Sequence, residues 1–161
     1  DEFKWDKKQK RAVVFADTWD EGYVALDNRG AVYLRRDGAS EAEAYQNAAP
    51  DGATCASLSY PHLTLGTSSG LIRCLDLSSS PPPSSAWTDP GMPVLNVTLT
   101  GARGDAFTSH ARGVFLHYSG GSVKGRYEVG YPGSVPNAFL REPGVGVFVG
   151  DTRGRLFFYR C

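Results

Sequence analysis

Four stretches of the chain share one pattern of hydrophobic and polar positions. Each has a short apolar run, a polar triplet that ends in glycine, and a second apolar run. The four copies are residues 23–36 (YVALDNRGAVYLRR), 63–76 (LTLGTSSGLIRCLD), 105–119 (DAFTSHARGVFLHYS) and 147–160 (VFVGDTRGRLFFYR). Their glycines, Gly30, Gly70, Gly113 and Gly154, lie 40, 43 and 41 residues apart. A polar triplet ending in glycine between two apolar runs predicts a β-hairpin, because glycine tolerates the positive φ of tight turns.

The strand after each glycine predicts which residues are buried. Side chains alternate between the two faces of a strand, so positions two residues apart share a face. The first such position holds Val32, Ile72, Phe115 and Leu156, and the second holds Leu34, Cys74, His117 and Phe158. Seven of these eight are apolar or cysteine, which predicts sheets that stack face to face and need neighbours to bury both faces.

Flanking runs supply two more strands for each copy. Inner strands are predicted at 12–19, 53–60, 94–102 and 135–141, and outermost strands at 2–7, 41–47, 85–89 and 123–129. A period near 40 residues with four short strands is typical of propeller blades. The predicted fold class is therefore all-β: a single β-propeller segment over 1–161 made of four-stranded antiparallel blades, with approximate units 1–38, 39–78, 79–120 and 121–161.

The copies resemble WD repeats. Residues 63–77 (LTLGTSSGLIRCLDL) match the family's glycine-containing strand, polar turn, glycine, Ile-Arg pair and Asp-Leu ending, and the copy at 147–160 is the next best match. The Trp-Asp pair of the family would fall at Leu75-Asp76, where only the aspartate is present. The resemblance implies rings of six to eight blades, in which the first strand completes the last blade.

Four units leave three assemblies open: part of a longer propeller, a half ring that dimerises, or a small closed ring of four blades. The resemblance implies a non-catalytic scaffold or adaptor that binds proteins through its rim loops. A structural subunit that completes a larger propeller with another chain is the first alternative. An enzyme or cofactor-binding propeller, with residues converging on the central channel, is the second.

Composition narrows the choice of partners. Seventeen basic and seventeen acidic residues cancel, which gives no reason to expect nucleic-acid or membrane binding. The three cysteines have no CxxC spacing, which argues against zinc and favours a reducing, intracellular (cytoplasmic or nuclear) location. No catalytic or metal-binding spacing is present among the histidines, so neither an enzyme nor a cofactor is expected.

The turn position before glycine carries the sharpest functional feature. It holds arginine in three copies, Arg29, Arg112 and Arg153. Equivalent turns of a propeller lie on one rim, so three guanidinium groups are expected on the same side, where each can bind carboxylates or phosphates with two hydrogen bonds. The predicted partner is a protein or peptide with acidic or phosphorylated groups. Trp19 and Tyr60 are predicted to lie near the same loops as aromatic anchors. The simpler alternative is that arginine is merely tolerated in an exposed turn.

Overall fold

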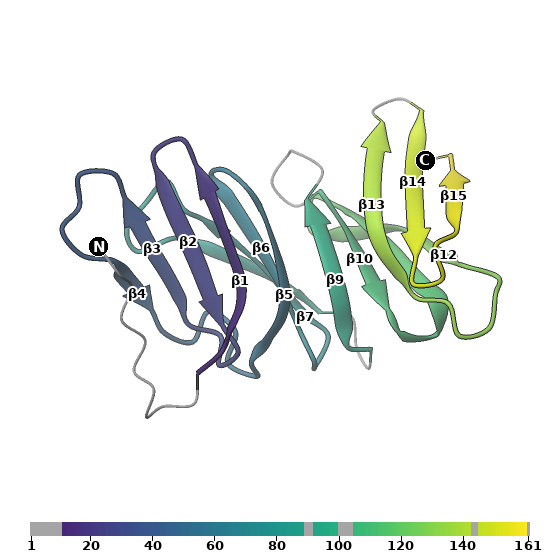
Figure 1. The fold of residues 1–161 in the computed structure, drawn as a ribbon, viewed down its shortest axis with the longest axis horizontal. Coiled ribbons are helices and arrows are strands. Elements are labelled where there is room, and N and C mark those ends of the chain that lie inside the picture. Colours follow the sequence, from purple (N-terminus) through teal and green to yellow (C-terminus); the bar gives the residue numbers. More distant parts are fainter. Residues whose placement is uncertain (1–10, 89–91, 100–104, 143–144, 161) are drawn as a thin grey trace.

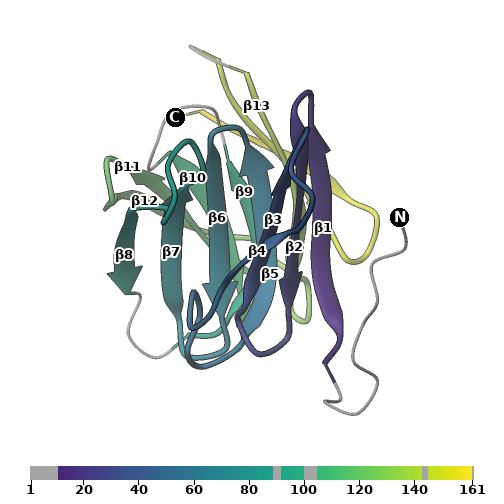
Figure 2. The same cartoon turned by 90° about the vertical axis from the view of Figure 1, so that its left-hand side faces the viewer.

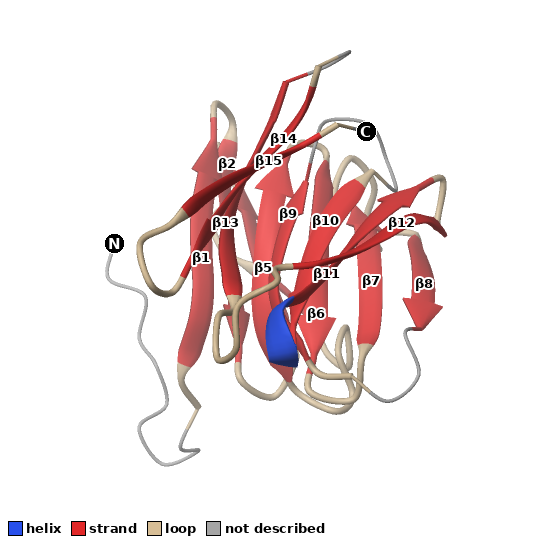
Figure 3. Cartoon of the chain, turned by 90° about the vertical axis from the view of Figure 1, so that its right-hand side faces the viewer, coloured by secondary structure: helices blue, strands red, loops and turns tan. Residues whose placement is uncertain are grey.

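The chain folds almost entirely into β-strands, arranged as four antiparallel sheets in a row (Figure 1). The computed structural model describes residues 11–88, 92–99, 105–142 and 145–160. The only helical turn among them is the short 3-10 segment η2 (Ala111–Gly113), shown in blue in Figure 3.

Each sheet is built from strands that are consecutive along the chain. The first holds β1 (Val13–Trp19), β2 (Gly22–Asp27), β3 (Val32–Arg36) and β4 (Glu43–Tyr45). The second holds β5 (Ala53–Ser59), β6 (His62–Thr67), β7 (Leu71–Asp76) and β8 (Ser84–Thr88). The third holds β9 (Val94–Leu99), β10 (Ala106–His110), β11 (Val114–Ser119) and β12 (Ser122–Glu128). The fourth holds β13 (Pro136–Glu142), β14 (Gly146–Asp151) and β15 (Leu156–Tyr159).

The sheets are offset from the sequence units by one strand. The strand β4 is the first strand of the unit at 39–78, yet it pairs with β3 as the outer strand of the first sheet. In the same way, β8 pairs with β7 in the second sheet and β12 pairs with β11 in the third. The fourth sheet has three strands in the described part of the chain, where the ring is not closed. The outermost strand predicted at 2–7 lies outside the described residues.

One apolar core fills the space between each pair of neighbouring sheets. The core between the first two sheets is aliphatic and contains Val24, Leu26, Val32, Leu34, Leu63 and Leu65. The next core contains Ile72, Val94, Val114, Leu116 and Tyr118. Figure 2 shows the second sheet beside the first, and Figure 3 shows the fourth sheet in front of the third. Stacking of sheets face to face is therefore what buries the apolar positions of each repeat.

The core between the third and fourth sheets is aromatic. The Phe115 ring packs edge-on against Tyr159, with centroids 4.9 Å apart, and stacks on Tyr127 at 4.8 Å. Phe139 lies 5.6 Å from Phe115 and stacks on Phe107 at 5.7 Å. Such offset and edge-to-face contacts stabilise aromatic pairs beyond the burial of their area.

The predicted core positions are buried in three sheets and exposed in the fourth. Val32, Ile72 and Phe115 have no exposed surface, but Leu156, which holds the same position, is 71% exposed. Phe158 is 44% exposed, whereas Leu34 and Cys74 are fully buried. The prediction of burial was wrong for the fourth copy because no described sheet lies on that side of it.

The aromatic core gives the first stability prediction. Phe115→Ala is expected to lower the free energy of unfolding by about 3–5 kcal/mol, since it removes a fully buried ring and leaves a cavity. The matched control is Val123→Ala on the outer strand β12, where the side chain is 51% exposed and the expected change is within about 0.5 kcal/mol. Equal losses for the two variants in urea unfolding would contradict the assignment of this core.

Candidate protein-interaction site

The turns of the four sheets fall on two opposite rims. The first strands β1, β9 and β13 point one way and the second strands β2, β10 and β14 point the other (Figure 1). We call the rim that carries the turns after the second strands the arginine rim; its turns are residues 28–31, 68–70, 111–113 and 152–155. The turns after the first strands, at 20–21 and 60–61, form the aromatic rim.

Arg29, Arg112 and Arg153 all lie exposed on the arginine rim. In the first and fourth sheets, the turn that carries the arginine is held by an aspartate that ends the second strand. The Asp27 carboxylate accepts hydrogen bonds from the backbone N–H of Arg29 and of Ala31, both at 2.9 Å. Asp151 accepts from the N–H of Arg153 and of Arg155 at the same distance. Such capping of a turn by an aspartate fixes the backbone of the next residues and leaves the arginine side chain outside.

The other two turns reach a similar shape with different residues. The residue three positions before the turn glycine is Thr67 in the second sheet, and its hydroxyl accepts a hydrogen bond from the Leu71 N–H at 3.0 Å. In the third sheet this residue is His110, which is buried, and Arg112 in the same turn has a positive φ of 63°. The structure therefore places Arg29, Arg112 and Arg153 at equivalent turns of the first, third and fourth sheets.

Each of the two capping aspartates is buried beside a cation. Asp27 lies 3.2 Å from the Arg11 guanidinium, and Asp151 lies 2.7 Å from that of Arg155. Burial disfavours the charged form of Asp151. Hydrogen bonds from the Ser134 hydroxyl, from Arg155 and from the N–H of Arg153 outweigh that effect and hold its pKa well below the ordinary value.

The capping aspartates were missed in the sequence, although a signal for them was present. The first and fourth copies share the pattern Asp-x-Arg-Gly, at 27–30 and at 151–154. An aspartate two residues before an arginine and three before a glycine is typical of a turn in which the carboxylate accepts backbone N–H groups.

Trp19 and Tyr60 lie on the aromatic rim, away from the arginines. The prediction that they lie near the arginine turns was wrong. Trp19 ends β1 and Tyr60 follows β5, and antiparallel strands put consecutive turns at opposite ends of a sheet. The structure does bring the two aromatic residues together: their rings stack with centroids 4.9 Å apart and planes 11° from parallel.

A pocket opens beside this aromatic stack. It has a volume of about 370 Å³ and is lined by Trp19, Asp20, Glu21 and Tyr60. The Tyr60 side chain is 42% exposed, and both acidic residues are exposed. The aromatic rim therefore presents flat apolar surface next to two carboxyl groups.

The described residues contain neither a cluster of potential metal ligands nor a helix that could cross a membrane. No three His, Cys, Asp or Glu side chains within them gather closely enough to hold a metal ion. No helix in the same residues has the length and hydrophobicity that crossing a bilayer requires.

The turn of the fourth sheet gives a prediction about pH. Because folding lowers the pKa of Asp151, its ionised form stabilises the folded state above the ordinary carboxyl pKa of about 3.9, and this stabilisation is lost as the pH falls below that value. Asp151→Asn is expected to lower the urea midpoint at pH 6, and the difference from the unsubstituted chain should shrink toward pH 2. The control is Asp37→Asn in an exposed turn. A difference that stays constant from pH 6 to pH 2 would contradict this role.

Comparison with known proteins identifies the fold. No protein-family model matches the sequence, and no curated protein is similar to it in sequence. Solved structures do match. BamB from Moraxella catarrhalis has a TM-score of 0.73 at 15% identity over 98% of this chain and 46% of its own. A chain of the mitotic checkpoint complex has a TM-score of 0.78 at 12% identity over 98% of this chain and 49% of its own.

A third match covers nearly the whole of both chains. It is the computationally designed Ika4 protein, with a TM-score of 0.69 at 9% identity over 94% of this chain and 92% of that one. This chain thus spans about half the length of the BamB and checkpoint-complex chains and nearly all of the designed protein. The β-propeller fold that the WD-repeat resemblance implies is confirmed, and the described chain is an open arc of four propeller blades.

Proposed function

We propose that this chain is a non-catalytic scaffold that binds other proteins through its rims. The observation that carries the proposal is the pocket on the aromatic rim, where the Trp19 and Tyr60 rings stack beside Asp20 and Glu21. Exposed aromatic residues are enriched at protein interfaces and often contribute most of the binding energy.

The chemistry of this pocket suits a basic side chain of a partner. A lysine or arginine placed over an aromatic face is attracted by the ring's quadrupole, and an exposed site of this kind is worth about 0.5–1 kcal/mol. The Asp20 and Glu21 carboxyl groups line the same pocket and would pair with that cation. The proposed ligand is therefore a peptide segment that carries Lys or Arg.

The arginine rim supports a second ligand of opposite charge. Arg29, Arg112 and Arg153 occupy equivalent exposed turns, and two of these turns are held by buried aspartates. A guanidinium on a rigid turn loses less conformational freedom when it pairs with a carboxylate or phosphate. We infer that an acidic or phosphorylated segment binds this rim, so the two rims would select different partners by charge.

The comparisons support a scaffold role in general terms only. One of the similar structures belongs to the mitotic checkpoint complex, an assembly of proteins. The expectation of an intracellular location, based on the cysteine pattern, stays a prediction.

The aromatic rim can be tested with a labelled basic peptide. Fluorescence anisotropy with an Arg- and Lys-containing octapeptide is expected to show binding, and Tyr60→Ser with Glu21→Lys should weaken it at least about tenfold, since both the ring and a carboxylate are lost. Tyr131→Ser with Glu128→Lys, at exposed positions at and after the end of β12 in the third sheet, makes the same chemical changes as a control. Equal weakening by both double variants would mean that net charge alone causes the binding.

The arginine rim requires a separate probe. A phosphoserine octapeptide is expected to bind the chain, and Arg112→Glu with Arg153→Glu should weaken that binding at least about tenfold while leaving the basic peptide unaffected. Arg126→Glu on β12 with Arg160→Glu just after the end of β15 supplies the same charge change away from these turns. Unchanged affinity of the rim variant for the phosphopeptide would rule out this second ligand.

A further inference from the structure

The fourth sheet ends the arc with an exposed apolar face. Leu140, Phe148 and Phe158 lie in one row across its three strands, and Leu156 is next to them on β15. Leu140 is 66% exposed and Leu156 is 71% exposed. The Phe148 and Phe158 rings pack against each other with their centroids 4.9 Å apart. Figure 3 views the molecule from this end of the arc. A cluster of large exposed apolar side chains on a soluble sheet marks an interaction surface.

The repeat shows what kind of surface this face is. Leu156 lies two residues after Gly154, as Phe115 lies two residues after Gly113, and Phe148 lies six residues before Gly154, as Phe107 lies six before Gly113. Phe107 and Phe115 are fully buried in the core against the fourth sheet. The exposed face of the fourth sheet therefore occupies the positions that pack on the next blade elsewhere in the chain.

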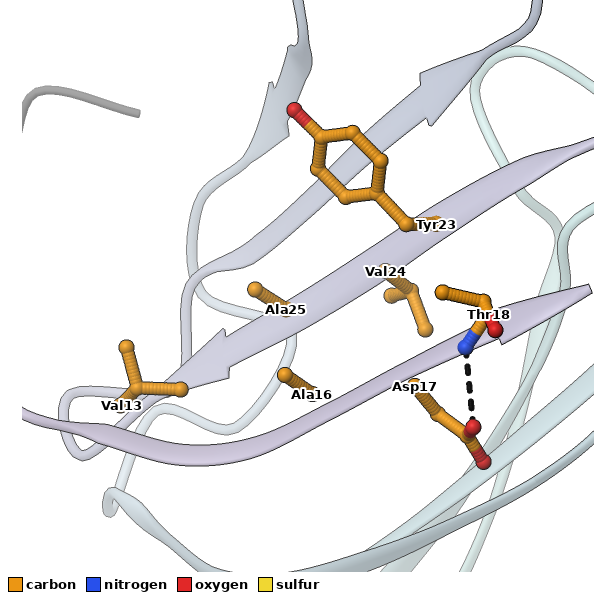
Figure 4. A pocket seen from close by; sticks show the side chains of 7 residues that line it. All are labelled: Val13, Ala16, Asp17, Thr18, Tyr23, Val24 and Ala25. Atoms are coloured by element: carbon orange, nitrogen blue, oxygen red, sulfur yellow. Dashed lines mark hydrogen bonds between the residues drawn. The ribbon is translucent and has the colours of Figure 1, made fainter. Parts of the chain in front are cut away.

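The first sheet offers a matching groove at the other end of the arc. The groove has a volume of about 480 Å³ and lies along β1 and β2, where small side chains such as Ala16, Thr18 and Ala25 form its wall (Figure 4). Tyr23 stands at one side of it, and the Asp17 carboxylate accepts the Thr18 N–H at 2.9 Å. This is the side of the first sheet that faces away from the second, since Val24 and Leu26 on the same strand point into the core between them.

Strand register shows why the groove is there. Ala16 pairs with Ala25 in the first sheet as Phe139 pairs with Val149 in the fourth. In the fourth sheet Phe139 packs on Phe107 and Phe115 of the preceding blade. The first sheet has Ala16 at the position where the fourth sheet has Phe139, so the volume that the phenylalanine ring fills between the third and fourth sheets is open in the groove. Phe148 and Leu156, the equivalents of Phe107 and Phe115, are the side chains that would project into it.

We propose that the open face of the fourth sheet docks into this groove on a second copy of the same chain. Large side chains at one end match small ones at the other, in the same register that joins the sheets within the chain. A contact between unlike faces of identical chains either closes into a ring or grows into a filament. This chain spans about half the length of the matched BamB and checkpoint-complex chains, so two copies supply the length of one such chain. Two copies with two identical contacts would then close one ring.

The state of association of the full 161-residue chain tests the proposal. Sedimentation velocity is expected to show a species of twice the 17.4 kDa of one chain. Leu156→Asp with Phe158→Asp should raise the dimer dissociation constant at least about 30-fold, the effect of losing a well-packed interface residue. Ala16→Trp, which fills the groove from the other side, should do the same. Because the two changes lie at opposite ends of the arc, an equal effect of both is the signature of a head-to-tail contact.

The control is Val123→Asp on the outer strand β12, where an exposed apolar residue lies outside both faces and the dimer should persist. Circular dichroism of each monomeric variant checks that the sheets remain folded. The proposal is overturned if the unsubstituted chain stays monomeric up to about 100 µM, a range that covers ordinary reversible dimers. It is also overturned if the dimer survives both Leu156→Asp with Phe158→Asp and Ala16→Trp, or if the chain forms species larger than two copies.

Discussion

A sheet with apolar residues on both faces must be covered on both sides, and the stacking of the four described sheets follows from this requirement. In each repeat the second and third strands present large side chains in alternate directions, such as Leu65 toward the first sheet and Ile72 toward the third. Neither face can be left in water without losing the hydrophobic stabilisation of about 25 cal/mol per Å² that burial supplies. Stacking covers the faces at the three interfaces between the described sheets, and no described sheet covers the outer faces of the first and fourth sheets.

The rims are a consequence of the stacking. Because each sheet is a run of antiparallel hairpins, its turns must alternate between two opposite edges, and stacked sheets collect equivalent turns on the same edge. The repeat therefore places Arg29, Arg112 and Arg153 on one edge and the Trp19–Tyr60 stack on the other. A rigid core with variable turns is the usual arrangement for binding surfaces in repeat folds.

Much of the fold could be predicted from the spacing of four glycines, because a tight turn needs a positive φ and Gly30, Gly70, Gly113 and Gly154 all have one. The alternation after each glycine then identified the core of three sheets. The prediction of burial failed for Leu156 and Phe158. An alternating pattern predicts which face of a strand can pack against a neighbouring blade, but it does not predict whether such a blade is present. The site was less predictable. Trp19 was assigned to the wrong rim because nearness in sequence to a turn does not imply nearness in space. Asp27 and Asp151 were missed because the prediction used only the glycine and the arginine before it, and not the residue three positions before the glycine.

The described part of the chain is an open arc of four sheets, and each of its two end faces has the residue pattern of a contact between blades. A crystal structure of the 161-residue chain would show what covers these faces. We expect four separate sheets in an arc, with Phe148 and Leu156 of one copy packed against Ala16 of another. A small closed ring, in which Leu156 packs against the first sheet of its own chain, would contradict this expectation.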